Sequence, residues 1–160
     1  MTYRILTVCT GNICRSPMAQ VVLAQRLREA GLDVEVDSAA VTPWEVGNPM
    51  DPRAAATLRR HGYELPNRVA RKVRPTDFQD FDLILPMTRD HLKDLRRLAG
   101  GGAAADIELF RSFTDPKLDP GKAQIDVPDP WYGGPEDFEE TLEILEAGVD
   151  RIADCVRANS

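Results

Sequence analysis

The sequence predicts an α/β fold, a three-layer sandwich with a central parallel four-stranded sheet and helices on both faces. Two observations predict it. Short β-rich stretches alternate along the chain with segments whose apolar residues recur at three- and four-residue steps. Such alternation of strand and helix favours parallel strands joined by crossover helices. The chain has 160 residues, 42% of them apolar, which is enough for one core. We therefore expect a single domain that spans residues 1–160.

These patterns place four strands and four helices. The strands are expected at Tyr3–Val8, Val34–Asp37, Leu83–Leu85 and Ile107–Phe110. The helices are expected at about 16–30, 52–61, 90–99 and 135–158. Two longer segments, 40–51 and 111–134, have no periodic pattern, and the second is rich in proline. The second segment could be a mobile surface insertion, but loops beyond the carboxyl ends of parallel strands often carry ligand sites, so it is also a candidate for function.

The composition excludes several classes of function. The formal net charge of −6 gives no basic field, so we expect neither nucleic acid nor a membrane surface as partner. No apolar run is long enough to span a membrane and no leader precedes the first strand, which predicts a cytoplasmic protein. Three cysteines and two histidines complete neither a disulfide framework nor a zinc site, so we expect no metal and no cofactor. We expect a monomer or a weak dimer.

The segment from Cys9 to Ser16 lies between the end of the first strand and the start of the first helix. The unpaired N–H groups of a tight loop and of a helix N-terminus attract an anion. Gly11 is expected to supply the torsional freedom of this loop, and Asn12 tolerates a left-handed conformation. We therefore expect the segment to bind a dianion such as phosphate. The phosphate-binding residues would be Thr10, Gly11, Asn12, Ile13, Cys14, Arg15 and Ser16.

Cys9 would lie beneath this anion, where N–H donors and an arginine favour the thiolate at neutral pH. Arg15 offers a planar fork that fits two phosphoryl oxygens, and Ser16 can donate a hydrogen bond to the sulfur as it leaves. Covalent catalysis through Cys9 is the natural mechanism. A cysteine at the end of a buried strand is more often an inert core residue. Here, however, the glycine, asparagine, serine and proline that follow it each fit a loop or a helix start.

The string CTGNICRS, residues 9–16, resembles the phosphate-binding loop of the low-molecular-weight protein tyrosine phosphatases. The resemblance covers nearly the whole chain, through DSAA (37–40), WEVGNPMDPRA (44–54), HGY (61–63), VARK (69–72), DFQDFDLIL (77–85) and DPWYGG (129–134). It implies a protein-tyrosine phosphatase that hydrolyses phosphotyrosine and small aryl phosphate monoesters through a phosphocysteine intermediate. Its partners would be tyrosine-phosphorylated proteins, and its catalytic residues would include Cys9 and Arg15.

A phosphocysteine mechanism needs an acid for the leaving oxygen and later a base for water. Asp129 lies in the segment VPDPWYGG, and by resemblance it matches the general acid of the family. Pro128 and Pro130 would stiffen its backbone, while Trp131 and Tyr132 would keep water away and favour the protonated carboxyl. Most aspartates that precede a proline are solvated turn residues, which is the alternative for Asp129.

Four residues are expected to form the substrate pocket. By resemblance, Trp44, Trp131 and Tyr132 wall a slot around the phosphotyrosine ring that is too deep for phosphoserine. Each could instead anchor its loop on the core, which is the commoner fate of a loop tryptophan. Ile13 belongs to the same pocket. Similar phosphatases that act on phosphoarginine carry threonine there, so isoleucine favours an aromatic phosphomonoester.

Cys14 is a second thiol on the loop. By resemblance it can form a reversible disulfide with Cys9 that protects the nucleophile from irreversible oxidation. The alternative is a small buried residue that only packs behind the loop.

Two other enzymes of the same fold are alternatives, a phosphoarginine phosphatase and a thiol-dependent arsenate reductase. The reductase would need two further cysteines near residues 80 to 90, and FDLILPMTRDH (81–91) contains none. A phosphopeptide-binding protein without catalysis would lack the acid, whereas Asp129 is present.

Three positions depart from the family pattern. Thr88 lies where many members have aspartate, Gln20 replaces a common glutamate, and Arg68 falls where several relatives carry a histidine that supports the loop asparagine. These differences concern residues around the phosphate-binding loop and could change its geometry and hence the rate.

Overall fold

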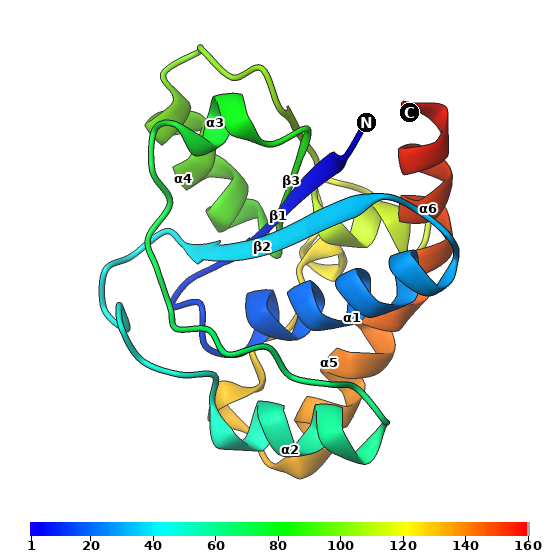
Figure 1. Cartoon of the computed structure of the whole chain (residues 1–160). Helices are drawn as coiled ribbons and strands as arrows, with labels where there is room; N and C mark the ends of the chain where they lie inside the picture. Colours follow the sequence, from blue (N-terminus) through cyan, green and yellow to red (C-terminus); the bar gives the residue numbers. More distant parts are fainter. Residues whose placement is uncertain (160) are drawn as a thin grey trace.

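The computed structural model describes residues 1–159, which form one sheet flanked by helices (Figure 1). The strands β1 (Tyr3–Cys9), β2 (Val34–Ala40), β3 (Leu83–Pro86) and β4 (Asp106–Ile107) run parallel in the order β2-β1-β3-β4. The helices are α1 (Arg15–Glu29), α2 (Pro52–Arg60), α3 (Asp77–Asp80), α4 (Arg89–Ala99), α5 (Pro135–Ala147) and α6 (Val149–Ala158). The predicted α/β fold with a parallel four-stranded sheet is confirmed.

The side chains of β1 alternate between two apolar cores, one on each face of the sheet. Ile5 and Cys9 belong to the larger core with residues of α1, α2, α5 and α6, whereas Leu6 and Val8 belong to the smaller core with residues of α3 and α4. A strand covered on both faces needs apolar residues in succession, because neighbouring side chains point to opposite faces. Figure 1 shows this division, with α3 and α4 on one side of the sheet and the other helices opposite.

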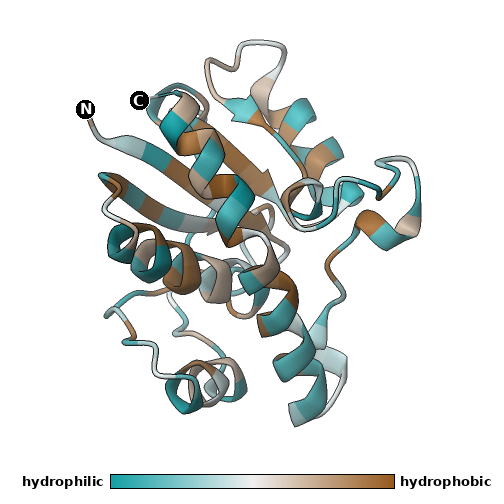
Figure 2. Cartoon of the chain, turned by 90° about the vertical axis from the view of Figure 1, so that its right-hand side faces the viewer, coloured by the Kyte–Doolittle hydropathy of each residue, from teal (hydrophilic) through white to brown (hydrophobic). Residues whose placement is uncertain are grey.

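Hydropathy follows the same layers. In Figure 2 the strands are largely hydrophobic, whereas the helices alternate between hydrophobic and hydrophilic residues along their length. Such amphipathic helices bury one stripe against the sheet and leave the other in water. In residues 1–159, no helix combines the length and the apolar character that crossing a membrane requires.

Most boundaries agree with the prediction to within one residue, but β2 and β4 differ by more and one short helix is additional. β2 continues to Ala40, three residues beyond its expected end, because it stays paired with β1 up to Cys9. β4 holds only Asp106–Ile107, and Phe110 starts a 3₁₀ turn instead of ending a strand. The apolar residues there are buried by packing against α6 and α5, not by pairing in the sheet. α3 was not predicted, because four residues are too few to show a helical period.

The single helix predicted over 135–158 is two helices, α5 and α6, that meet at Gly148. The Gly148 N–H donates to Leu145 O three residues back, which is a tighter turn than that of an α-helix. A Cβ at Gly148 would lie 2.9 Å from Cε1 of Phe110, so the aromatic ring occupies the space of a side chain. The apolar residues keep their helical spacing across this break, which is why the sequence pattern indicates one helix.

The strand order places the end of β1 at a topological switch point. The chain leaves β1 for β2 on one side and continues to β3 on the other, and in open α/β sheets ligands bind in the crevice that forms there. After β3, the Met87 N–H donates to Val8 O, and the Val127 N–H donates to Met87 O. These bonds hold the segment that precedes Asp129 at the same edge of the sheet.

Candidate active site

The loop between β1 and α1 has its backbone carbonyls turned toward the surrounding segments. The carbonyl oxygens of Cys9, Thr10, Asn12, Ile13 and Cys14 accept hydrogen bonds from Val41 N, Thr42 N, Arg68 Nη2, Asp51 N and Met18 N, respectively. In contrast, the backbone N–H groups of Thr10 to Cys14 donate to no other protein atom within residues 1–159. The loop therefore keeps its donors available for an anion, next to the N-terminus of α1.

Asn12 carries the special backbone conformation of this loop, with a φ of 61°. It is the only residue other than glycine with a positive φ in the described part of the chain. The expectation that Gly11 supplies the torsional freedom is wrong, since Gly11 does not have a positive φ. A Cβ at Gly11 would instead lie 3.2 Å from Cγ of Glu45, so glycine lets the 44–46 segment approach the loop closely.

The Asn12 side chain is fully buried and uses all its hydrogen-bonding capacity. Its Nδ2 donates to Ser16 Oγ and to Ser38 Oγ, both at 2.8 Å. Its Oδ1 accepts from the Arg71 backbone N–H at 3.1 Å and from Arg68 Nη2 at 2.5 Å. Because a backbone N–H can only donate, the Arg71 contact fixes which end of the amide is oxygen. Arg68, one of the three positions that depart from the family pattern, thus contacts the loop asparagine directly.

Ser16 lies between Asn12 and the sulfur of Cys9, with its Oγ 2.9 Å from Cys9 Sγ. Since Asn12 Nδ2 already donates to the Ser16 oxygen, the hydroxyl proton is available to the sulfur. Ser38 repeats this arrangement, because it accepts from Asn12 and donates to Gln20 Oε1 at 2.5 Å. The orientation of the buried Asn12 amide therefore sets the direction of two hydrogen bonds, from Ser16 to the sulfur and from Ser38 to Gln20.

Arg15 and Asp129 meet at the mouth of the loop. The Arg15 guanidinium is buried, and its Nη1 donates to Val127 O at 3.0 Å. Its Nη2 lies 3.5 Å from Oδ2 of Asp129. The structure thus brings Cys9, Arg15 and Asp129, which are far apart in sequence, to the wall of one pocket.

Asp129 begins the 3₁₀ turn Pro130–Tyr132, and its Oδ1 accepts from the Trp131 N–H at 3.1 Å. Arg53 of α2 holds this turn from outside by donating to Trp131 O at 3.2 Å. The Asp129 side chain is 35% exposed. The neighbouring aromatic residues therefore shield it from water only in part, contrary to the expectation that they would exclude water.

The pocket has a volume of about 190 Å³, below the usual range for drug-sized ligands and suited to a phosphate on one ring. It is lined by Cys9, Thr10, Gly11, Ile13, Cys14, Arg15, Trp44, Glu45, Asp129, Trp131 and Tyr132. Trp44 is 75% exposed and Tyr132 is 83% exposed, so these rings are not anchored in the core. The rings of Trp131 and Tyr132 pack edge to face with centroids 5.1 Å apart. All four predicted pocket residues line this one pocket.

Cys14 is buried, and burial, with further contributions from Asp51 and Cys9, raises the pKa of its thiol. Both Cys9 and Cys14 are free thiols in this structure. The protective disulfide between them stays a prediction. No group of three or more His, Cys, Asp or Glu residues in 1–159 is placed to hold a metal ion.

His91 contacts the loop but was not identified from the sequence. Its Nε2 lies 2.7 Å from Thr10 Oγ1, and the ring is buried. Thr88 caps α4 by accepting from the His91 N–H, so threonine serves here as the helix cap. Burial, together with the charge of Arg15, lowers the pKa of His91 to about 3. In the sequence, only Thr88, the residue that caps α4, indicates that His91 lies in the first turn of a helix.

Comparison with known proteins agrees with this geometry. The family model "Low molecular weight phosphotyrosine protein phosphatase" matches residues 4–160. A low molecular weight protein-tyrosine-phosphatase of Streptomyces coelicolor is 46% identical over 160 residues, covering 98% of this chain and 95% of that protein. The crystal structure of YfkJ from Bacillus subtilis has a TM-score of 0.87 at 31% identity and covers 100% of this chain and 98% of its own. The crystal structure of an arginine phosphatase from Drosophila has a TM-score of 0.84 at 29% identity and covers 94% of this chain and 95% of its own. The chain belongs to the low molecular weight phosphotyrosine protein phosphatase family.

Proposed function

We propose that this pocket hydrolyses the phosphate monoester of phosphotyrosine, with Cys9 as nucleophile, Arg15 as the phosphoryl-binding group and Asp129 as acid and then base. Family membership makes the chain a protein-tyrosine phosphatase, a hydrolase that acts on phosphoproteins. The residue roles are supported by one observation above all. The thiol, the guanidinium and the carboxyl line a single pocket whose loop N–H groups have no other protein partner in residues 1–159.

In the first step the Cys9 thiolate attacks phosphorus. A sulfur–phosphorus bond forms while the bond from phosphorus to the tyrosine oxygen breaks. The fork of Arg15 and the loop N–H groups bind the phosphoryl oxygens, whose charge they stabilise during transfer. Protonated Asp129 gives its proton to the leaving phenolic oxygen.

In the second step a water molecule attacks the phosphorus of phosphocysteine. Asp129, now a carboxylate, takes a proton from that water, and the sulfur–phosphorus bond breaks. Inorganic phosphate leaves, and Cys9 returns as a thiolate that accepts a hydrogen bond from Ser16, whose Oγ lies 2.9 Å away. No metal or cofactor takes part in either step.

Two aryl phosphates with different leaving groups test these roles. Cys9→Ser is expected to abolish hydrolysis of both p-nitrophenyl and phenyl phosphate. Asp129→Asn is expected to slow phenyl phosphate about 100-fold or more and p-nitrophenyl phosphate much less, because the better leaving group needs no acid. Asp150→Asn, an exposed aspartate of α6, is the matched control. Equal rates for Asp129→Asn and parent on phenyl phosphate would refute the acid, and full activity after alkylation of Cys9 would refute the nucleophile.

Phosphoarginine is the second candidate substrate, because one similar structure is that of an arginine phosphatase. Ile13 and the exposed rings of Trp44 and Tyr132 support the aromatic substrate instead. The parent enzyme is therefore expected to hydrolyse a phosphotyrosine peptide faster than the matched phosphoarginine peptide. The reverse order would identify the alternative.

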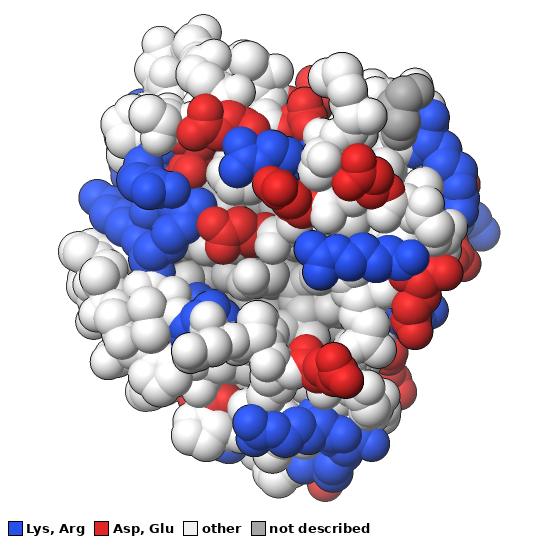
Figure 3. Space-filling model, viewed as in Figure 1, with Lys and Arg blue, Asp and Glu red and all other residues white. Residues whose placement is uncertain are grey.

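We further infer that residues 1–160 act as one catalytic domain, as a monomer or weak dimer in the cytoplasm. The three cysteines are free thiols, which suits a reducing compartment. Lys, Arg, Asp and Glu side chains are interspersed over the face shown in Figure 3, so this face offers no broad surface of one sign to a nucleic acid. Attraction for the phosphoryl group would then come from the loop itself.

A further inference from the structure

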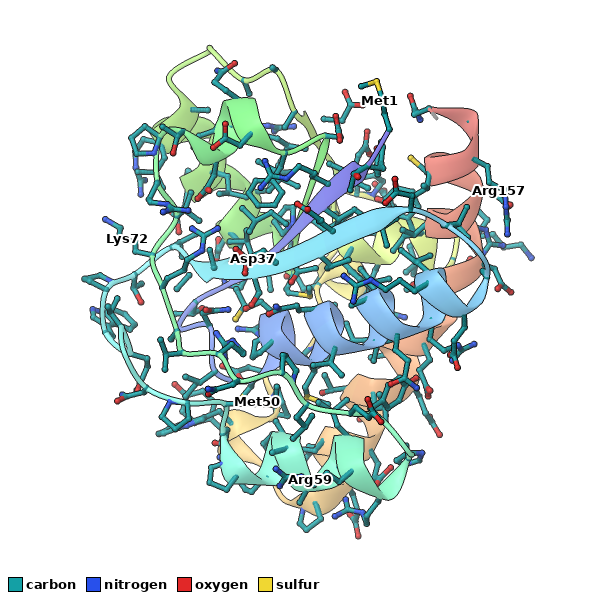
Figure 4. All side chains as sticks on the ribbon, in the orientation of Figure 1. Met1, Asp37, Met50, Arg59, Lys72 and Arg157 are labelled. Atoms are coloured by element: carbon teal, nitrogen blue, oxygen red, sulfur yellow. The ribbon has the colours of Figure 1, made fainter. Side chains whose placement is uncertain are left out.

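Arg68 lies behind the phosphate-binding loop, on the segment that connects α2 to α3. Its Nη2 donates to Asn12 O at 3.0 Å and to Asn12 Oδ1 at 2.5 Å, while its Nη1 is buried without a hydrogen-bond partner. In Figure 4 this segment runs along the lower edge of α1, between the labelled Asp37 on β2 and Arg59 on α2. The Arg68 side chain is half-buried, and a buried N–H group without a partner is costly, so its presence needs a physical reason.

Arg68 makes no direct ion pair with a carboxylate of the described residues. No ion pair of Arg68 occurs within residues 1–159, because the nearby acids serve other arginines. Arg71 lies 3.0 Å from Asp37 and 2.9 Å from Asp77, and Arg74 lies 3.7 Å from Asp77. The carboxylates of Asp37 and Asp77 thus pair with the guanidinium groups of Arg71 and Arg74. Arg68 is left without an ion-pair partner among the described residues.

This charge persists over the working range of pH. Burial lowers the pKa of Arg68, whereas Asp37 and Cys9 raise it. An arginine starts from so high a value that it stays protonated in proteins. A continuous path leads from the guanidinium to the sulfur, through Asn12 Nδ2 and Ser16 Oγ to Cys9 Sγ. Hydrogen bonds in such a chain polarise one another.

We propose that Arg68 is a positioning residue whose unpaired positive charge stabilises the Cys9 thiolate from behind the phosphate-binding loop. This inference rests on the proposed role of Cys9 as nucleophile. Arg68 acts on the sulfur in two ways. It fixes the orientation of the Asn12 amide, which in turn directs the Ser16 hydroxyl toward the sulfur. It also supplies a positive charge that stabilises the negative charge of the thiolate.

The other groups around the sulfur do not supply the same charge. Arg15 lies in front of the loop, but Asp129 is 3.5 Å from its guanidinium. His91 is neutral at neutral pH, because burial lowers its pKa to about 3. Cys14 keeps its proton, because burial raises the pKa of its thiol. In the described residues, Arg68 is therefore the cation next to the loop that has no carboxylate within ion-pair distance.

The pH dependence of Cys9 alkylation by iodoacetamide, followed by mass spectrometry, tests the proposal without any substrate. Arg68→Met is expected to raise the pH midpoint of alkylation by about one unit. Arg68→Lys, which keeps a positive charge, is expected to retain most of the parent's midpoint. Arg59→Met is the matched control, because it removes an exposed arginine from the pocket that Arg59 shares with Arg68. An unchanged midpoint in Arg68→Met, or equal shifts in the Met and Lys variants, would overturn the role of the charge.

Gln20→Glu provides a second test that leaves Arg68 in place. Gln20 ends the hydrogen-bond chain beyond Ser38, so a carboxylate there adds a negative charge to the same network. The alkylation midpoint is expected to rise, and an unchanged midpoint would overturn the proposal even if Arg68→Met failed to fold. Phosphotyrosine turnover of the parent is measured separately. Loss of that turnover would refute the proposed function, whereas the alkylation midpoints decide the role of Arg68.

Discussion

Asn12 shows how one residue can organise a binding loop. Its positive φ turns the chain, and its buried amide accepts from the 68–71 segment while donating to two serines. An asparagine at φ > 0 is tolerated more readily than most residues, but a tolerated conformation does not hold a loop by itself. The four hydrogen bonds of the Asn12 side chain fix the loop in this conformation. The two bonds that Nδ2 donates also restrict the hydroxyl protons of Ser16 and Ser38, so backbone geometry and proton placement are set together.

Ser16→Ala tests the hydrogen bond to the sulfur. The Ser16 Oγ lies 2.9 Å from Cys9 Sγ, and its proton has no competing acceptor in the Asn12 amide. Hydrogen bonds to charged groups are worth about 1.5–3 kcal/mol, so kcat for p-nitrophenyl phosphate is expected to fall about 10- to 100-fold with little change in KM. Steady-state and pre-steady-state kinetics measure this loss in the step where the thiolate leaves.

Ser38→Ala is the comparison for Ser16→Ala. Ser38 bonds the same Asn12 amide but reaches the sulfur only through Asn12 and Ser16. Loss of the Ser38 hydroxyl is therefore expected to lower kcat less than loss of the Ser16 hydroxyl. Equal losses in the two variants would mean that Ser16 acts by supporting the loop and not by donating to sulfur.

At the scale of elements, Gly148 separates α5 from α6 because the ring of Phe110 packs against it. Gly148→Ala would place a Cβ 2.9 Å from Phe110 Cε1, in a fully buried site. Forcing an extra methyl into a packed core costs about 1–3 kcal/mol. We therefore expect urea unfolding to show a free energy of unfolding that is lower by about this amount, with kcat/KM little changed.

Gly102→Ala is the matched control for Gly148→Ala. The nearest atom to a Cβ at Gly102 is Ala99 O at 3.7 Å, which is an ordinary contact. Stability is expected to change little there. A Gly148 variant as stable as the parent would show that the C-terminal pair of helices can shift as a unit and does not depend on the Phe110 contact.

The sequence predicted elements where the pattern is local. β1 and α1 follow from apolar spacing and from the serine-proline start, and the loop between them follows from residues adjacent in the chain. Features that depend on distant contacts were missed. Phe110 closes a strand-like apolar run, yet packing against Gly148 makes it part of a 3₁₀ turn. In the site, Cys9 and Arg15 could be identified from one string, whereas the contacts of Arg68 and His91 to the loop need the folded chain.

At the scale of the whole molecule, the sheet edge collects groups from three separate regions. The loop after β1, the cap of α4 after β3 and the segment before α5 all lie at the carboxyl ends of the strands. This convergence follows from the parallel topology, because every strand ends at the same edge. It also buries a histidine beside an arginine, which ties the stability of the fold to pH.

His91 should make the folded protein less stable in mild acid. Burial, and secondarily the charge of Arg15, lowers its folded pKa from 6.5 to about 3. Between these values the unfolded chain binds a proton that the folded chain does not, so stability falls as pH drops below 6.5. Each unit is worth about 1.4 kcal/mol, so roughly 2 kcal/mol is lost from this group between pH 7 and pH 5.

His91→Asn is expected to remove this part of the pH dependence. Urea unfolding of parent and variant at pH 5, 7 and 8 measures it, because the parent should lose about 2 kcal/mol more than the variant between pH 7 and 5. Between pH 7 and 8 the imidazole is mostly neutral in both states, so the two proteins should change almost in parallel, which serves as an internal control. The absolute stability of the variant also reports the lost contact to Thr10, but that loss is common to all three pH values. Parallel curves down to pH 5 would show that the buried imidazole takes up its proton in the folded protein, and His91 would then be cationic beside Arg15.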